Sequence, residues 1–246
     1  MRVTVLQSAA DLRPAWVDGC LHSVAEWCAM AGYEYQFIDD GLFDCVPRWY
    51  LDKVAGRLPI AADYARLWHC RRLLNEGAEQ VVWIDADTLV TDVRWRLPGE
   101  YHTIFGEECW IQSDDKGRLE VKRQPHNAFC AFRHDSPVLD FLVDATQSII
   151  SRADGQFIAP QMVGPKLLKA LHNIVHFQLL PAVGALSPEV IRAIVDGGGK
   201  ALELFITERR CDTAMANLCA SLQQYSANED QLPLADIRRL VGAVAL

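Results

Sequence analysis

Two carboxylates follow an apolar run near the middle of the chain. Asp85 and Asp87 come directly after residues 81–84, a continuous apolar segment typical of a strand buried on both faces. Ligands bind at the carboxyl ends of strands in α/β sheets, and side chains two residues apart on an extended chain point to one side. Adjacent anions repel, and their hard oxygens suit Mg²⁺ or Mn²⁺. We therefore expect a divalent cation here, with open positions that bind a diphosphate.

The position of this motif matters more than its spacing. The chain has 20 Asp residues, so its composition alone predicts roughly 1.6 Asp-x-Asp matches, and one is found. The spacing by itself therefore indicates nothing. Its place directly after a buried strand carries the prediction.

A second charged pair lies upstream of that strand. Asp63 and Arg66 are three residues apart in a predicted helix over 60–76, so they share one helix face. Taken alone, the spacing favours a surface ion pair, which contributes little stability.

Strands and helices alternate along the rest of the chain. Apolar runs predict strands at 3–6, 35–38, 103–105, 128–132 and 175–180, with an exposed turn at 113–117. Helical patterns are expected over 15–31, from 136 to about 150, over 165–171, from 187, over 212–223 and from 233 onward. This alternation favours an α/β sandwich with a mostly parallel sheet, in one domain.

Composition excludes several classes of protein. Half of the residues are hydrophobic, and 24 Lys+Arg against 32 Asp+Glu give a net charge of −8, which fits a folded globule and argues against a nucleic-acid partner. The first apolar run is too short for a signal peptide, and no stretch is long enough to span a membrane. The eight cysteines have no C-x-x-C spacing, so we expect reduced thiols and a cytoplasmic protein. Near the C-terminus, docking of residues 234–246 on the domain is favoured over contact with a membrane surface.

The block from Asp63-x-x-Arg66 through Gly77 to Val-Val-Trp-Ile-Asp85-Ala-Asp87 resembles the DXD sugar-binding glycosyltransferases. This family includes initiating mannosyltransferases, capsular-polysaccharide transferases and glucosylating clostridial toxins. Weaker similarities follow in the same order, at His126-Asn127-Ala-Phe and at Gly164-Pro165. The resemblance spans about residues 1–190, and residues 60–90 are its specific part.

The resemblance implies a GT-A fold, a Rossmann-type α/β sandwich with a mixed, mostly parallel central sheet and flanking helices. Residues 1–110 would form the donor-binding half of a single domain, and residues 111–246 the acceptor-side half. The implied activity is metal-dependent transfer of a sugar, with retention of configuration, from a UDP- or GDP-sugar to a saccharide or glycan. The implied cofactor is Mn²⁺ or Mg²⁺.

The resemblance also implies roles for individual residues. Asp85 and Asp87 would hold the metal and diphosphate and contact the ribose or sugar. Asp63 and Arg66 would bind donor-sugar hydroxyls or support Asp85. Asn127 would face the sugar near the reacting carbon. Together with Asp87 and Asn127, Gln161 would be a catalytic residue. Gly164, close to Gln161 in the sequence, would let the backbone approach the ligand, and Gln7 would lie near the nucleotide base.

One departure from the family concerns the metal. The family commonly supplies a further ligand near the C-terminus, often a His in a motif with a following Trp. Here the last His is His176 and the last Trp is Trp110. Glu208, Asp212 and His176 are the candidate substitutes. We favour Asp212, because it falls at an expected helix start where its side chain is free of the core.

Two other classes fit the same residues. Residues 81–90 are close to the first motif of haloacid-dehalogenase-type phosphohydrolases, in which Asp85 would be the nucleophile and Asp87 a general acid beside Mg²⁺. That motif normally opens its domain, whereas here 84 residues precede it. The non-enzyme alternative is an inactive relative that binds a sugar nucleotide or a partner.

Overall fold

The computed structural model describes residues 2–155, 157–220 and 232–242. Its main sheet has six strands in the order β2-β1-β3-β6-β5-β7. A smaller sheet has the order β4-β9-β8. The strands are β1 (Val3–Ser8), β2 (Glu34–Ile38), β3 (Gln80–Ile84), β4 (Thr88–Val90), β5 (Thr103–Ser113), β6 (Leu119–Arg133), β7 (Gln178–Leu180), β8 (Val183–Ala185) and β9 (Met215–Asn217).

The main sheet is mixed and mostly parallel. β1 pairs in parallel with β2 and β3, and β7 pairs in parallel with β5. β6 runs antiparallel to both β3 and β5, so it is the one reversed strand of this sheet. The predicted α/β architecture is therefore confirmed.

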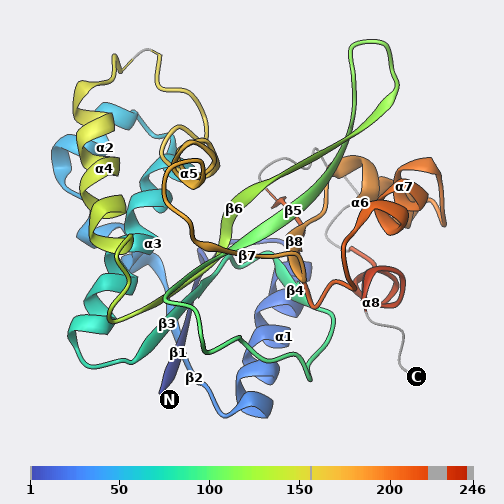
Figure 1. Cartoon of the computed structure of the whole chain (residues 1–246), viewed down its shortest axis with the longest axis horizontal. Helices are drawn as coiled ribbons and strands as arrows, with labels where there is room; N and C mark the ends of the chain where they lie inside the picture. The colour runs from blue at the N-terminus through green and yellow to red at the C-terminus, as the bar shows by residue number, and fades with distance from the viewer. Residues whose placement is uncertain (1, 156, 221–231, 243–246) are drawn as a thin grey trace.

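Helices cover both faces of the main sheet. Figure 1 shows α2, α3 and α4 on one side and α1 on the other, while the β5–β6 hairpin extends beyond the sheet. The helices are α1 (Ala15–Ala31), α2 (Arg48–Val54), α3 (Leu58–Asn75), α4 (Leu139–Arg152), α5 (Pro165–His172), α6 (Pro188–Val195), α7 (Lys200–Glu208) and α8 (Leu234–Val241), with a 3-10 helix at Asp40–Cys45. Within the described ranges, every helix is too short or too polar to cross a bilayer.

β3 is buried on both faces, as its apolar sequence predicts. Val81 and Trp83 pack into the core formed with α3 and α4, and Val82 and Ile84 pack into the core formed with α1. Burial of each such side chain stabilises the fold by about 1.5–3 kcal/mol. The end of β3, where Asp85 begins, is therefore held in place from two sides.

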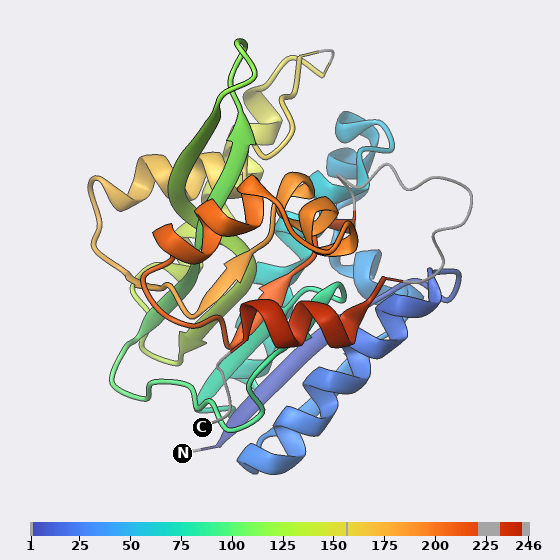
Figure 2. The ribbon, with the colours of Figure 1, turned by 90° about the vertical axis from the view of Figure 1, so that its right-hand side faces the viewer.

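A third core joins the C-terminal helices to the rest of the protein. α6, α7 and α8 pack with the first turns of α1 and with the β5–β6 hairpin, through residues that include Trp16, Ile111 and Ile237. Figure 2 shows α8 lying against the body of the protein near α1.

Several predicted elements are confirmed, and others are wrong. α1 and α5 lie within a residue of their predicted bounds, and α6 begins where Ser187 Oγ accepts a hydrogen bond from Val190 N (3.3 Å). The helix expected over 212–223 is wrong, because residues 215–217 form β9 between β4 and β8. This strand pairing outweighs local helix preference. β5 and β6 are much longer than predicted, and α2 and α7 were not predicted.

Candidate active site

The chain turns directly after β3. Asp85 N donates to Ala128 O on β6 (2.8 Å), and Thr88 N donates back to Asp85 O (3.1 Å). Residues 85–87 are therefore a turn and not the extended segment that we expected. Both carboxylates nevertheless line one cavity of about 600 Å³, a size typical of small-molecule sites. Its acidic and amide side chains are those of Asp63, Asp85, Asp87, Glu108, Gln112, Gln124, Asn127, Gln161 and Asn217.

Asp85 is oriented through one of its two carboxylate oxygens. Oδ1 accepts hydrogen bonds from Arg66 Nη1 (2.9 Å) and Trp83 Nε1 (2.6 Å). The Arg66 guanidinium lies 5.5 Å from the centroid of the Trp83 ring, within range of a cation–π interaction. In the part of the chain that the structure describes, no hydrogen bond reaches Oδ2. This oxygen is available to a ligand.

Asp63 and Arg66 form a buried pair, so the interpretation as a surface ion pair is wrong. Their side chains are 9% and 8% exposed, with 3.4 Å between Arg66 Nη2 and Asp63 Oδ1. Arg66 Nη1 also donates to the Asn127 carbonyl (2.6 Å), and Asn127 Nδ2 donates to Asp63 Oδ1 (2.7 Å). Burial raises the pKa of Asp63, while Arg66 and Asn127 act in the opposite direction. The guanidinium thus connects two carboxylates and a strand of the sheet.

Asp87 is held by β9 and the residues that follow it. Its Oδ1 accepts from Asn217 Nδ2 (2.6 Å), and its Oδ2 accepts from Ala220 N (2.7 Å). Asn217 lies opposite Thr88 in the β4–β9 pairing, so the register of this small sheet aligns the amide with the carboxylate. Sequence reasoning missed Asn217. The signal was present, because an apolar run at 214–216 precedes it, just as an apolar run precedes Asp85.

The acidic pair fits a divalent cation. Burial, followed by the charge of Asp85, raises the pKa of Asp87 to about 6, because Asp87, unlike Asp85, has no cationic side chain against it among the described residues. Within the cluster of Asp63, Asp85, Asp87 and Arg66, the carboxylates outnumber the guanidinium, so the cluster is negative. Asp85 and Asp87 are the two carboxylates that could hold such an ion, and no group of three or more His, Cys, Asp or Glu suited to a metal occurs among the described residues. The other positions would remain for water and a diphosphate.

Asp212, the predicted third ligand, lies elsewhere. It is exposed and pairs with Arg209 (2.6 Å) in the loop after α7, and it does not line the cavity. The other two candidates are also outside the cavity lining: Glu208 pairs with Arg123, and His176 stacks on His172. The expectation for Asp212 failed because residues 212–214 lead into a strand and not into a helix. Asn217 occupies the place beside Asp87.

Gln7 is an interior residue. It is fully buried, donates from Nε2 to Asp85 O (3.2 Å), and accepts at Oε1 from the Tyr35 hydroxyl (3.1 Å). It does not line the cavity. The structure therefore gives Gln7 a supporting contact to the backbone of Asp85, where we expected a contact to the base.

Gln161 and Gly164 lie in the loop that leads to α5. Gln161 lines the cavity with φ at +63°, a left-handed conformation that is uncommon for a non-glycine residue. A Cβ on Gly164 would lie 2.5 Å from Asp63 Oδ2. The glycine thus permits close approach of Asp63, where we expected approach of a ligand.

The opposite wall of the cavity is the β5–β6 hairpin. It contributes Glu108, Trp110, Gln112, Lys122, Gln124 and His126. Burial raises the pKa of Glu108 to about 7, although the hydrogen bond from Gln124 acts against the shift. Burial lowers the pKa of His126, whose Nε2 lies 3.1 Å from Val183 O. Apart from His126, the sequence did not single out these hairpin residues, because their polar side chains obscure the strand pattern.

Comparisons with known proteins identify the fold. No protein-family model matches the sequence, and no curated protein is significantly similar to it. The galactosyltransferase LgtC, solved in complex with donor and acceptor sugar analogues, superimposes with a TM-score of 0.51 at 13% identity, covering 97% of this chain and 95% of that one. The chain therefore has the GT-A fold of the glycosyltransferases.

Two further solved structures are similar at lower scores. A glycosyltransferase involved in glycosylation of the major capsid of PBCV-1 has a TM-score of 0.49 at 11% identity, covering 94% of this chain and 97% of that one. Apo mouse xyloside xylosyltransferase 1 has a TM-score of 0.48 at 10% identity, covering 91% and 99%. The fold assignment rests on LgtC.

Proposed function

We propose that this protein is a metal-dependent glycosyltransferase that moves a sugar from a nucleotide-sugar donor to a saccharide or glycan acceptor. The observation that carries the proposal is the acidic turn after β3, where Asp85 and Asp87 line one cavity with the Arg66 network in a GT-A fold. We further propose a UDP- or GDP-sugar donor and transfer with retention of configuration, both on the sequence resemblance. The eight free cysteines favour a reducing compartment, so we propose the cytoplasm.

Each residue of the site would have its own role. Bound Mn²⁺ or Mg²⁺ supplies positive charge that stabilises the leaving diphosphate. Asp85 and Asp87 would hold the ion, and Arg66 fixes Asp85 in its orientation. Asn127 uses its amide nitrogen on Asp63, and Oδ1 has no hydrogen bond among the described residues, so this oxygen is free for a sugar hydroxyl. The Gln161 amide is likewise unbonded there and lines the same cavity.

A binding screen tests the proposal. UDP-, GDP- and CMP-sugars are added with and without Mn²⁺, and thermal unfolding is followed. We expect the metal and one nucleotide sugar to stabilise the protein cooperatively, because each neutralises the charge of the other. Asp85→Asn and Asp87→Asn should remove the metal-dependent part of the shift. Metal-dependent binding that persists unchanged in both variants would contradict the assignment.

Turnover distinguishes an enzyme from an inactive relative. Release of the nucleoside diphosphate is measured for the stabilising donor, with saccharide acceptors present. Binding without release would indicate a sugar-nucleotide-binding protein. The anomeric configuration of the product, measured by NMR, tests retention.

A further inference from the structure

The β5–β6 hairpin has two faces of opposite character. Alternate residues of β5 (Glu108, Trp110 and Gln112) lie opposite alternate residues of β6 (Gln124, Lys122 and Glu120) in the register of the hairpin. We call these six residues the inner hairpin face. All except Glu120 line the cavity, and Glu120 is hydrogen-bonded to Gln112. The intervening residues of the other face pack into the core formed by the C-terminal helices: Cys109, Ile111, Leu119 and Val121.

The inner hairpin face carries little net charge. Lys122 Nζ pairs with Glu120 Oε1 at 2.7 Å, and Gln112 Nε2 donates to the same oxygen at 2.8 Å. Glu108 is 7% exposed and has Gln124 as its hydrogen-bond partner. Burial in these surroundings favours the neutral carboxyl. An anionic ligand would find no unpaired cation on this face.

The remaining groups match a surface of hydroxyls. A hydroxyl both donates and accepts, and so do a glutamine amide and a protonated carboxyl. Gln112, Gln124 and Glu108 therefore offer both kinds of partner along one strip. Trp110 stands among them at a half-buried position, and its indole is an apolar surface with one N–H donor. A saccharide presents apolar ring C–H groups on its faces and hydroxyls at its edges, which fits this arrangement.

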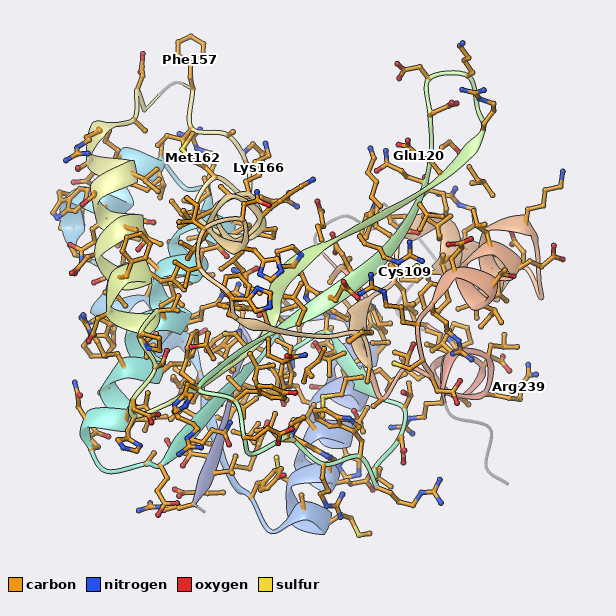
Figure 3. The ribbon with its side chains drawn as sticks, in the orientation of Figure 1. Cys109, Glu120, Phe157, Met162, Lys166 and Arg239 are labelled. Atoms are coloured by element: carbon orange, nitrogen blue, oxygen red, sulfur yellow. The ribbon has the colours of Figure 1, made fainter. Side chains whose placement is uncertain are left out.

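The inner hairpin face begins at the candidate active site and extends away from it. The cavity that contains Asp85, Asp87 and Asn127 also contains Glu108 and Trp110. At about 3.4 Å per residue, Glu108 to Gln112 spans about 14 Å, which is longer than a single hexose ring. In Figure 3 this hairpin, with Glu120 labelled, extends away from the sheet on the side opposite Lys166 of α5.

We infer that the inner hairpin face binds an uncharged oligosaccharide acceptor, with one sugar ring stacked on Trp110 and the neighbouring hydroxyls bonded to Gln112, Gln124 and Glu108. This inference rests on the proposed transferase function. It adds the class of acceptor and makes Trp110 a specificity-determining residue.

Saturation-transfer NMR tests the inference without turnover. The probes are lactose, maltose and cellobiose, with glucuronic acid as an anionic comparison, and the protein is the wild type, Trp110→Ala or Trp49→Ala. Trp49 lies on α2 and is 42% exposed, so it is a matched control for an accessible tryptophan outside the cavity. We expect at least one disaccharide to bind the wild type and Trp49→Ala, and to lose at least tenfold in affinity in Trp110→Ala.

The outcomes separate the two proposals. Equal binding to Trp110→Ala and wild type, no disaccharide binding to wild type, or binding of glucuronic acid alone would overturn the inference. The nucleotide-sugar thermal shift is measured on the same proteins, and Trp49→Ala, which lies outside the cavity, should leave it unchanged. If that shift is missing in every protein, the proposed function fails whatever the NMR result. Gln112→Leu, at a half-exposed position, tests the same face if Trp110→Ala does not fold, and it should weaken the same disaccharide.

Discussion

Arg66 connects more parts of the site than any other residue described above. Its guanidinium touches the carboxylates of Asp63 and Asp85 and the backbone carbonyl of Asn127, so one side chain ties α3 to the acidic turn and to β6. A planar group with several fixed donors can make these contacts together, whereas the single ammonium of lysine cannot. The site therefore requires the shape of this residue as well as its charge.

Arg66→Lys should reduce transfer by about 100-fold, because Asp85 loses the contact that fixes its orientation. Steady-state kinetics with the stabilising donor measures this loss. Arg72→Lys is the matched control on the same helix, where the arginine makes a half-exposed pair with Glu76. The control should retain nearly full activity. Equal activity of the two variants would contradict this prediction and would show that Arg66 has only a structural role.

Glu108 should make stability depend on pH. Burial raises its pKa in the folded protein from an ordinary value of 4.5 to about 7, so between these two values the folded state binds the proton more tightly than the unfolded state. Its contribution to stability is therefore fully present below pH 4.5 and falls as pH rises towards 7. The loss amounts to about 3 kcal/mol at most.

Glu108→Gln should remove that part of the pH dependence. Urea unfolding of wild type and variant is compared at pH 5 and pH 8. The free energy of unfolding of the variant, relative to that of the wild type, should be higher at pH 8 than at pH 5. Glu100→Gln, at an exposed position, provides the control and should leave the pH dependence unchanged. If stability depends on pH in the same way in Glu108→Gln and in the wild type, the pKa of Glu108 is not raised by folding.

The segment that begins α5 acts on the site through a close packing contact. Gly164 lies directly against the carboxylate of Asp63, which in turn holds Asn127. Gly164→Ala places a methyl group 2.5 Å from Asp63 Oδ2, so either the loop or Asp63 must move. We expect a loss of about 1–3 kcal/mol in stability and weaker donor binding.

Gly155→Ala is the comparison for that variant. Its Cβ would lie 3.5 Å from the nearest atom, Lys53 O, which is ordinary contact. Chemical denaturation and donor-induced thermal shift report on both variants. A Gly164→Ala protein that behaves like Gly155→Ala would mean that the contact relaxes without effect on Asp63.

Elements with strong local signals could be predicted from the sequence. The continuous apolar run of β3 and the Ser187 cap of α6 both identify their elements without knowledge of the fold. The spacing of Asp63 and Arg66 correctly placed them on one face. Their burial could not be predicted, because it depends on β6 and α5 packing over that face from distant positions in the chain.

Elements that depend on long-range pairing were missed. β9 is three residues long and is defined by its neighbours β4 and β8, far away in the sequence. The same pairing brings Asn217 to Asp87, so the error in the element caused the error in the site residue. The lengths of β5 and β6 were underestimated for a related reason. One face of the hairpin lines the cavity and is polar, so the two strands lack a continuous apolar run.

At the scale of the whole molecule, β9 connects the C-terminal third of the chain to the acidic turn. Asn217→Ala should weaken metal-dependent nucleotide binding by about tenfold, because Asp87 loses the amide that orients it. Isothermal titration with Mn²⁺ and the nucleoside diphosphate measures the change. Asn173→Ala, at an exposed position, is the control, and Asp212→Asn should also leave binding intact. A larger effect from Asp212→Asn than from Asn217→Ala would reverse this assignment.

The position of β9 also affects when, during synthesis of the chain, the site becomes able to bind a nucleotide. Asp63, Arg66, Asp85 and Asp87 are translated early, and the two groups that hold the Asp87 carboxylate, Asn217 and Ala220, come more than a hundred residues later. A nascent chain that ends before residue 215 carries the acidic turn without its partner strand, so the Asp87 carboxylate has no Asn217 amide to orient it. Capacity to bind a nucleotide should therefore arise late, when the ribosome has released residues 215–220, and incomplete chains should not sequester donor.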